Sequence, residues 1–274
     1  MRFRKYNAIG NDYIVLEPPA VELTEQQIRK ICNRNFGVGA DGILQGSEKT
    51  DGSFNLRIFN PDGSEAEKSG NGIRIFARYL WEKKKHLSKF SIITAGGRVE
   101  ATVSENGKSV TVNMGRVNFQ SNKIPVAGPS REVINEKMTI NGKSLTYCAA
   151  TIGNPHCVIL CEQINPDLAK RLGSAVEIEP RFPNRTNVQF MQVIDRQNIK
   201  IEIWERGAGY TLSSGSSSCA AAASAYRLGL CDSKITVQMP GGKIGIAIGK
   251  DYSVRMTGPV AKVFEGVTSE EIFD

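Results

Sequence analysis

Long apolar runs are missing from this sequence of 274 residues. No stretch approaches the roughly 20 residues that span a bilayer, and the N-terminal segment mixes charges with short apolar pieces instead of forming the core of a signal peptide. We therefore expect a cytoplasmic protein with no membrane partner. Histidine is also scarce, with 2 residues, so few side chains titrate near neutral pH.

Motifs for metal binding and for disulfide frameworks are absent as well. The 6 cysteines fall at irregular spacings without a Cys-x-x-Cys pair, and we expect them to be mostly buried thiols. The net charge of +7 raises the question of nucleic-acid binding, but we interpret the only dense basic run, residues 83–85, as the solvated end of a helix. The sequence thus predicts no metal site and no nucleic-acid partner.

What is present is the composition of a globular protein rich in turns and strands, with 40% hydrophobic residues and 27 glycines. Helices are expected at residues 71–83 and 217–229, each after a glycine-rich loop. In the first, Ile73, Phe76 and Leu80 recur at helical spacing and predict a buried stripe, whereas the second is small and apolar nearly all round and should be buried within a lobe. Alternating patterns and turn signals predict strands at residues 2–6, 13–16, 54–59, 90–94, 99–103, 109–114, 144–150, 157–160, 186–193, 199–204, 234–239, 243–248 and 254–256.

The order of these segments indicates an internal duplication, because strands, a glycine-rich turn, a buried helix and further strands occur twice. The predicted fold class is α/β (α+β) with two pseudo-symmetric lobes. Candidate boundaries lie in the polar stretch after Arg116 and near residues 258–259. The N-terminal lobe would then comprise residues 1–117 and 263–274, and the C-terminal lobe residues 118–262.

The two glycine-rich loops carry the candidate chemistry. Ser69 precedes Gly70 and Ser214 precedes Gly215, each at the start of a helix, where unpaired N–H groups and the positive end of the helix dipole favour an anion. Either loop alone is also explained by a serine N-cap followed by a glycine turn. Two such sites together would hold an α-carboxylate and stabilise the negative charge that forms when a proton leaves the neighbouring carbon.

A set of short segments along nearly the whole chain resembles the diaminopimelate epimerase family in identity and order. The segments are residues 10–12 (GND), 39–42 (GADG), 60–64 (NPDGS), 70–72 (GNG), 153–156 (GNPH), 185–188 (RTNV) and 205–209 (ERGAG). The resemblance implies two mirrored lobes, each a β-barrel-like sheet around a central helix, with the active site in the cleft between them. It also implies no pyridoxal phosphate, no metal, a small amino-acid substrate and a homodimer.

The resemblance further implies a reaction and the residues that carry it. Family members convert LL- to meso-diaminopimelate, a lysine and peptidoglycan precursor, with two cysteines acting as base and acid from opposite faces of the α-carbon. The reacting end of the substrate would be held by Asn11, Gly70, Asn71, Gly215 and Ser216. Glu205 would lie beside the reacting ammonium, and the distal amino and carboxylate groups would be bound by Asn60, Asn154, Asn187 and Arg206.

Departures from the family pattern fall on the catalytic centre. Ser69 and Ser214 stand where the family has its two cysteines, Tyr210 stands where it has glutamate, and Gly42 stands where some members have glutamine. A thiol has a pKa of about 8.5, which a helix N-terminus lowers further. A serine, in contrast, acts as a base only when another group takes its proton. The differences at Tyr210 and Ser217 favour natural divergence over a designed double substitution.

The group that would take the proton from serine is not identified by the sequence. His156 and Tyr210 are possible accessory residues, while His86 lies in a lysine-rich segment. The main hypothesis is a cofactor-independent amino-acid epimerase or racemase. The alternatives are a related isomerase that uses a carboxylate, from Glu205, Glu65 or Glu67, and a catalytically inactive amino-acid-binding homologue.

Overall fold

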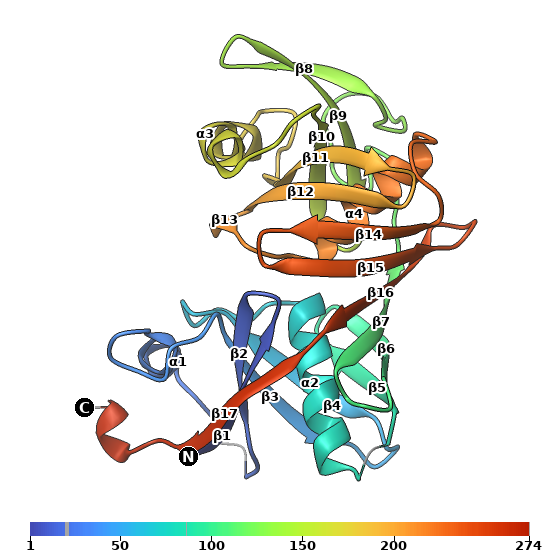
Figure 1. Ribbon diagram of the computed structural model, residues 1–274. Helices are drawn as coiled ribbons and strands as arrows, with labels where there is room; N and C mark the ends of the chain where they lie inside the picture. Colours follow the sequence, from blue (N-terminus) through green and yellow to red (C-terminus); the bar gives the residue numbers. More distant parts are fainter. Residues whose placement is uncertain (20–21, 86, 274) are drawn as a thin grey trace. The chain divides into compact units, whose positions relative to one another are not determined.

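The computed structural model describes residues 1–19, 22–85 and 87–273, so His86 lies outside the described residues. The chain forms two compact units, an N-terminal unit of Met1–Asn113 and Thr257–Asp274 and a C-terminal unit of Met114–Met256 (Figure 1). The expected boundaries lie a few residues further along the chain. The reason is that β7 (Ser109–Arg116) and β16 (Ser253–Pro259) each run without interruption from one unit into the other.

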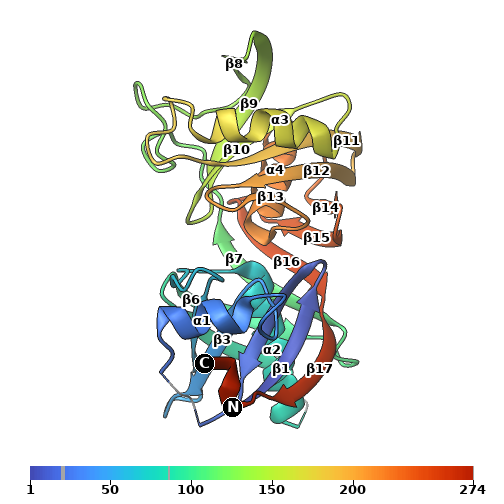
Figure 2. The same ribbon diagram turned by 90° about the vertical axis from the view of Figure 1, so that its left-hand side faces the viewer.

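In the N-terminal unit, a single sheet surrounds one helix. Its strands pair in the order β17, β1, β2, β3, β4, β5, β6, β7. Their bounds are β1 Arg2–Ala8, β2 Asn11–Leu16, β3 Ile43–Glu48, β4 Phe54–Phe59, β5 Lys89–Thr94, β6 Gly97–Val103 and β17 Ala261–Val267, and the helices are α1 Glu25–Cys32, α2 Gly70–Lys83 and the short 3-10 helix Glu270–Phe273. Helix α2 is the one that lies among the strands (Figures 1 and 2).

Helix α2 is buried on more faces than its apolar stripe predicts. The expected Ile73, Phe76 and Leu80 are buried, but so are Arg74 and Trp81 on other sides. Contacts with β1, β2, β3 and β6 explain this, because the curved sheet encloses the helix instead of covering one side. The N-terminus of α2 is thereby fixed in the interior of the unit.

The C-terminal unit has the same plan. Its strands pair in the order β8, β9, β10, β11, β12, β14, β15, with the short β13 added on β12. The bounds are β8 Glu136–Ile140, β9 Lys143–Thr151, β10 Pro155–Leu160, β11 Asn187–Asp195, β12 Asn198–Glu205, β13 Gly209–Thr211, β14 Lys234–Met239, β15 Gly242–Ile248, α3 Pro166–Glu177 and α4 Gly215–Arg227. Helix α4 contacts β9, β10, β11, β12, β14 and β15 and is the central helix of this unit.

The strand pairings establish the duplication that the sequence predicts. From β1 to β6 the successive pairs are antiparallel, parallel, antiparallel, parallel and antiparallel, and the series from β9 to β15 is the same. Each parallel pair needs a crossover connection. Helices α1 and α2 provide the two crossovers in the first unit, and α3 and α4 provide them in the second.

Small side chains allow α4 to occupy the centre of its unit. Residues 219–223, Cys-Ala-Ala-Ala-Ala, are fully buried, and the helix begins two residues earlier than the sequence pattern suggests, directly after Ser214. The cysteines are free thiols, five of them buried and Cys161 half-buried. No helix among the described residues is long and apolar enough to cross a membrane.

Candidate active site

In the N-terminal unit the candidate site is built around Ser69, the N-cap of α2. Its backbone is extended, with φ −135° and ψ 117°, and its Oγ accepts a hydrogen bond of 3.1 Å from the N–H of Gly72. The phenolic oxygen of Tyr13, on β2, lies 3.2 Å from the same Oγ. Ser69 is therefore the predicted N-cap, and its Oγ also lies within hydrogen-bond distance of a second hydroxyl group, that of Tyr13.

A directed chain of side chains orients the amides beside Ser69. Arg74, which is fully buried, donates to Asn71 Oδ1, and Asn71 Nδ2 donates to Asn11 Oδ1 over 3.0 Å. Asn11 Nδ2 in turn donates over 3.0 Å to Asp41, which also accepts from Arg34. A guanidinium can only donate and a carboxylate can only accept, so the two charged ends fix the orientation of both amides. The structure thus brings Asn11 and Asn71 into direct contact.

Asp12 extends this network into the strand. It accepts from Arg34 over 2.7 Å and from Lys5 over 2.8 Å, and its side chain is 9% exposed. Burial by itself would raise the pKa of this carboxyl, but the hydrogen bonds from Arg34 and Lys5 outweigh burial and lower it to about 2. The ion pairs thus hold the end of β2 that carries Asn11.

The lowered pKa of Asp12 predicts a loss of stability in acid. A carboxyl with a lower pKa in the folded state stabilises the protein above its unfolded pKa of about 4, and this contribution disappears as the pH falls from about 4 to about 2. We expect Asp12→Asn to lower the free energy of unfolding in urea by roughly 1–2 kcal/mol at pH 7, but not at pH 2.

Asp251 offers a matched control for this measurement. Its pKa is also lowered to about 2, mainly by hydrogen bonds from Ser253, but the carboxylate is exposed. Asp251→Asn should therefore change the free energy of unfolding little at either pH. A loss for Asp12→Asn that is equal at pH 7 and pH 2 would mean that lost packing, and not its charge, explains the effect.

In the C-terminal unit Ser214 is the N-cap of α4. Its backbone is again extended, with φ −150° and ψ 127°, and its Oγ accepts from the N–H of Ser217 over 3.5 Å. The Oγ of Ser216, in the first turn of α4, accepts from Asn154 Nδ2 over 3.5 Å. The Oγ of Ser217 accepts from Gln189 over 2.9 Å. The structure thus brings Asn154 and Ser216 together at the start of α4.

His156 lies beside Asn154 and is fully buried. Its Nε2 is 3.0 Å from Asn154 Oδ1. Burial lowers the pKa of His156 to about 3, against the opposing effect of the Gln189 amide, so the ring is neutral at pH 7. A neutral ring with so low a pKa is a poor base, but it holds the Asn154 amide in place.

Asn187 and Arg206 also contact each other in the C-terminal unit. Asn187 begins β11; its Nδ2 donates to the carbonyl of Pro155 over 2.9 Å, and its Oδ1 accepts from the N–H of Arg206 over 3.0 Å. The guanidinium of Arg206 is exposed and donates to the carbonyl of Asn184 over 3.1 Å. Glu205, half-buried at the end of β12, precedes Arg206.

The turn that carries Arg206 is held by Glu177, which the sequence did not reveal as a site residue. This carboxylate is buried at the end of α3 and accepts from the N–H of Gly207 over 2.8 Å, from the indole of Trp204 over 2.7 Å and from Arg185. A buried carboxylate satisfied by several donors fixes its partners firmly. Glu177 therefore sets the position of the Glu205–Arg206 segment without belonging to it.

The side chains of Asn60 and Tyr210 form hydrogen bonds with residues outside the predicted site. Asn60 closes the turn after β4, where its Nδ2 donates to Ser64 over 3.0 Å. The hydroxyl of Tyr210 donates to Glu202 over 2.7 Å, and burial, together with this carboxylate, raises the pKa of the phenol. The structure therefore assigns Tyr210 a partner other than Ser214.

Tyr13 is a further residue that the sequence patterns did not single out. A signal was available, because side chains two positions apart on a strand share a face and Tyr13 follows Asn11 by two. The packing at Gly42 makes the contact possible. A Cβ atom at Gly42 would lie 2.6 Å from the ring of Tyr13 and 2.4 Å from the carbonyl of Phe59. The missing side chain at position 42 leaves space for the phenol.

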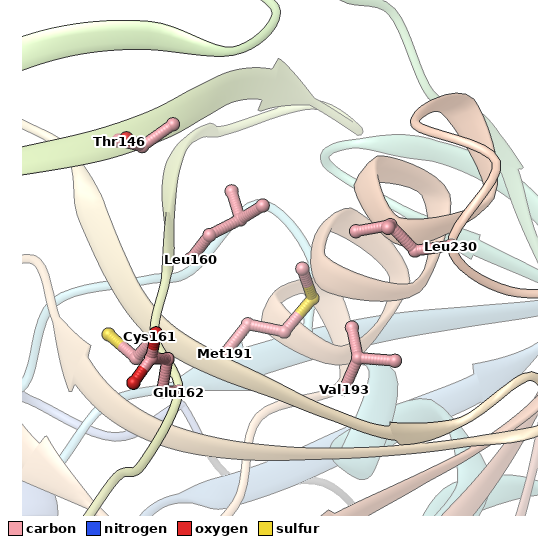
Figure 3. Close-up of a pocket in the computed structure, with 7 residues that line it drawn as sticks. All are labelled: Thr146, Leu160, Cys161, Glu162, Met191, Val193 and Leu230. Carbon is pink, nitrogen blue, oxygen red and sulfur yellow. The ribbon is translucent and has the colours of Figure 1, made fainter.

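A separate pocket of about 380 Å³ lies on the C-terminal unit and is shown in Figure 3. It is lined by Thr146, Leu160, Cys161, Glu162, Met191, Val193 and Leu230. None of these residues belongs to the predicted substrate-binding set, and the lining is mainly apolar. The pocket is therefore lined by other residues than the predicted site at Ser214.

Comparison with solved structures shows first which fold this is. A probable proline racemase from Agrobacterium radiobacter matches with a TM-score of 0.74 at 13% identity, covering 100% of this chain and 94% of that one. A hydroxyproline epimerase from Agrobacterium vitis matches with a TM-score of 0.72 at 14% identity, covering 97% and 91%. These similarities confirm the predicted fold of two mirrored α/β lobes.

Sequence comparison then identifies the family. The model of the diaminopimelate epimerase family matches residues 3–120 and 148–263. The chain is 59% identical to diaminopimelate epimerase 2 of a Nostoc species over 100% of its length and 97% of the relative, and 36% identical to the diaminopimelate epimerase of Moorella thermoacetica over 97% and 98%. The chain belongs to the diaminopimelate epimerase family. The predicted enzyme class, an isomerase, is confirmed.

Proposed function

We propose that this chain interconverts LL- and meso-diaminopimelate without a cofactor, by moving the α-proton with Ser69 on one face of the α-carbon and Ser214 on the other. One observation carries the proposal. In a chain 59% identical over its whole length to a relative named diaminopimelate epimerase 2, both serines are N-caps of central helices and accept a backbone N–H. The product would serve lysine and peptidoglycan synthesis.

The surroundings of each serine suit proton transfer at an amino-acid α-carbon. A carbanion beside a carboxylate is costly, and backbone N–H groups at a helix N-terminus stabilise negative charge at that position. Asn11 and Asn71, oriented by Arg74 and Asp41, supply further polar groups at the Ser69 end. In this proposal Arg206, Asn154, Asn187 and Asn60 hold the distal end of the substrate.

The two alternative functions are not favoured. Full-length relatives at 59% and 36% identity carry epimerase names, which argues against an isomerase with different chemistry and against a mere binding protein. Glu65, one of the carboxylates considered as a base, is paired with Arg57 over 2.9 Å at the surface. Its carboxylate therefore already has a charged partner.

Loss of the α-proton signal in heavy water tests the proposal directly. We expect the protein to exchange the α-protons of LL- and meso-diaminopimelate at least about 100-fold above the protein-free rate, since positioned acid–base groups contribute about 10²–10⁴-fold. Lysine, which lacks the distal carboxylate, serves as the substrate control and should exchange far more slowly. Binding of diaminopimelate to the folded protein with no exchange at either centre would overturn the proposal.

We further propose a cytoplasmic location, because six free thiols suit a reducing compartment. The family resemblance also predicts a homodimer, which sedimentation velocity can test. We propose no nucleic-acid partner and no membrane partner, because the sequence has one short basic run and no long apolar run.

A further inference from the structure

We propose that Tyr13 is the titratable partner of Ser69 and exchanges a proton with it during the reaction. The inference rests on the proposed function and deepens it, because it names the group that lets a serine replace a cysteine. Its basis is the distance of 3.2 Å between the Tyr13 phenolic oxygen and Ser69 Oγ, within one unit of the protein.

The hydrogen bonds at Ser69 leave a defined role for the phenol. One lone pair of Ser69 Oγ accepts from the N–H of Gly72 at the start of α2. The oxygen has one proton to donate, and a hydroxyl can both donate and accept. The contact with Tyr13 can therefore run in either direction, which a proton relay between base and acid forms requires.

The chemistry of the two hydroxyls makes the pairing useful. An aliphatic hydroxyl needs another group to take its proton, whereas a phenol has a pKa of about 10 and is an accepted acid or base in enzymes. The pKa of a phenol is much closer to that of a thiol, about 8.5, than the pKa of an aliphatic hydroxyl is. Tyr13 thus places an acid–base group one hydrogen bond away from Ser69, where a thiol would need no such partner.

The proton balance of the step is simple. When the α-proton is removed, the Cα–H bond breaks, the proton passes to Ser69 Oγ, and the hydroxyl proton of Ser69 passes to the Tyr13 phenolate. The electron pair of the broken bond stays on the α-carbon. In the reverse direction Ser69 protonates the carbanion and is reprotonated by the Tyr13 phenol. No oxidant, metal or further reactant takes part.

Packing holds the phenol in position for this exchange. Tyr13 is 6% exposed, and its ring occupies the space left by Gly42, where an added Cβ would approach to 2.6 Å. A buried side chain confined in this way loses little entropy when it meets its partner. The residue acts through Ser69 and not on the substrate itself, so we class it as a positioning and proton-storing residue.

Tyr6 provides a matched control. It lies directly opposite Tyr13 on the neighbouring strand β1, and its hydroxyl donates over 2.9 Å to Glu82, near the C-terminal end of α2. Tyr6→Phe removes a buried phenolic hydroxyl from the same strand pair without touching Ser69. We expect it to leave proton exchange within threefold of the unchanged protein.

The test compares deuterium exchange at the two configurations of the α-carbon of diaminopimelate in five proteins: unchanged, Tyr13→Phe, Tyr6→Phe, Ser69→Cys and the double variant Tyr13→Phe with Ser69→Cys. With serine at position 69, we expect Tyr13→Phe to slow exchange of one configuration about 100-fold and to leave the other within threefold. The pH dependence of exchange at the slowed configuration should also change, whereas that of the other configuration should not. With cysteine at position 69, the same change should cost less than threefold, because the thiol titrates by itself.

The outcomes separate this inference from the proposed function. An equal loss from Tyr13→Phe in both backgrounds, or an equal loss at both configurations, means a structural role and overturns the inference while exchange itself still supports the function. Exchange by the Ser69→Cys protein only also overturns the inference, since serine then does not carry the proton. No exchange by any of the proteins overturns the proposed function together with the inference.

Discussion

Ser69→Ala and Ser214→Ala should each lower the rate of epimerisation by at least about 10³-fold, since each removes a group that a two-base proton transfer requires. The remaining serine can still remove and return the proton on the face that it meets. Each variant should therefore keep deuterium exchange at one configuration and lose it at the other, with the two variants complementary. Proton NMR of LL- and meso-diaminopimelate in heavy water measures both rates.

The stability of these variants separates chemistry from folding. Each serine caps its helix by accepting one N–H, from Gly72 or Ser217, and loss of an N-cap costs about 1 kcal/mol. That loss is small beside the stability of about 5–15 kcal/mol typical of a folded protein. Ser218→Ala is the matched control: its Oγ donates to the carbonyl of the N-cap Ser214, so the variant loses a hydrogen bond at the start of α4 but keeps both serine side chains that cap the helices. Loss of exchange at both configurations in either alanine variant would contradict the assignment of one serine to each face.

Local patterns predicted most strands because burial alternates along them. β4 and β14 coincide with the predicted ranges, and each buries every second residue or nearly so. Four strands were missed for identifiable reasons: β3 is interrupted by Gly46, β8 and β13 are short, and β17 is exposed along almost its whole length, so it carries no buried face. Its place beside β1 depends on a pairing between the two ends of the chain, which no local pattern contains.

The candidate site divides in the same way between local and long-range causes. A serine before a glycine at the start of an apolar helix predicts the N-cap, and both Ser69 and Ser214 are N-caps. The contact between Tyr13 and Ser69 needs three distant segments, because the ring also depends on the space at Gly42. Residues 13, 42 and 69 are joined by the pairing of β2 with β3 and by the position of α2, which the sequence alone does not specify.

The two units support their serines differently despite their common plan. Ser69 has a phenol within hydrogen-bond distance, whereas beside Ser214 the helix start is joined through Ser217 to the Gln189 amide, next to the neutral His156. A two-base reaction does not need equal partners, since one group gives and the other takes a proton in each direction. The same repeat can therefore diverge separately in each half, and the substitutions at positions 69 and 214 need separate explanations.

Arg206→Ala should raise the KM for diaminopimelate by about 100-fold or more, because it removes the guanidinium proposed to bind the distal carboxylate, and charged hydrogen bonds of this kind contribute about 2–5 kcal/mol to binding. The effect on kcat should be much smaller, since the distal end lies away from the α-carbon. Arg206→Lys keeps the charge but not the planar fork, and should give an intermediate KM. Steady-state kinetics with diaminopimelate measures all three proteins.

The backbone contacts of Arg206 make this change a clean one. Its N–H to Asn187 and the contact of Gly207 with Glu177 are made by the main chain and survive the substitution, so the turn should keep its shape. Arg196→Ala removes another exposed arginine of the same unit, paired with Asp232, and should leave KM unchanged. Lysine, with no distal carboxylate, should be exchanged equally slowly by Arg206→Ala and by the unchanged protein. A similar fall in the exchange rates of both substrates would show that Arg206 acts on the reacting end. The proposed orientation of the substrate would then have to be reversed.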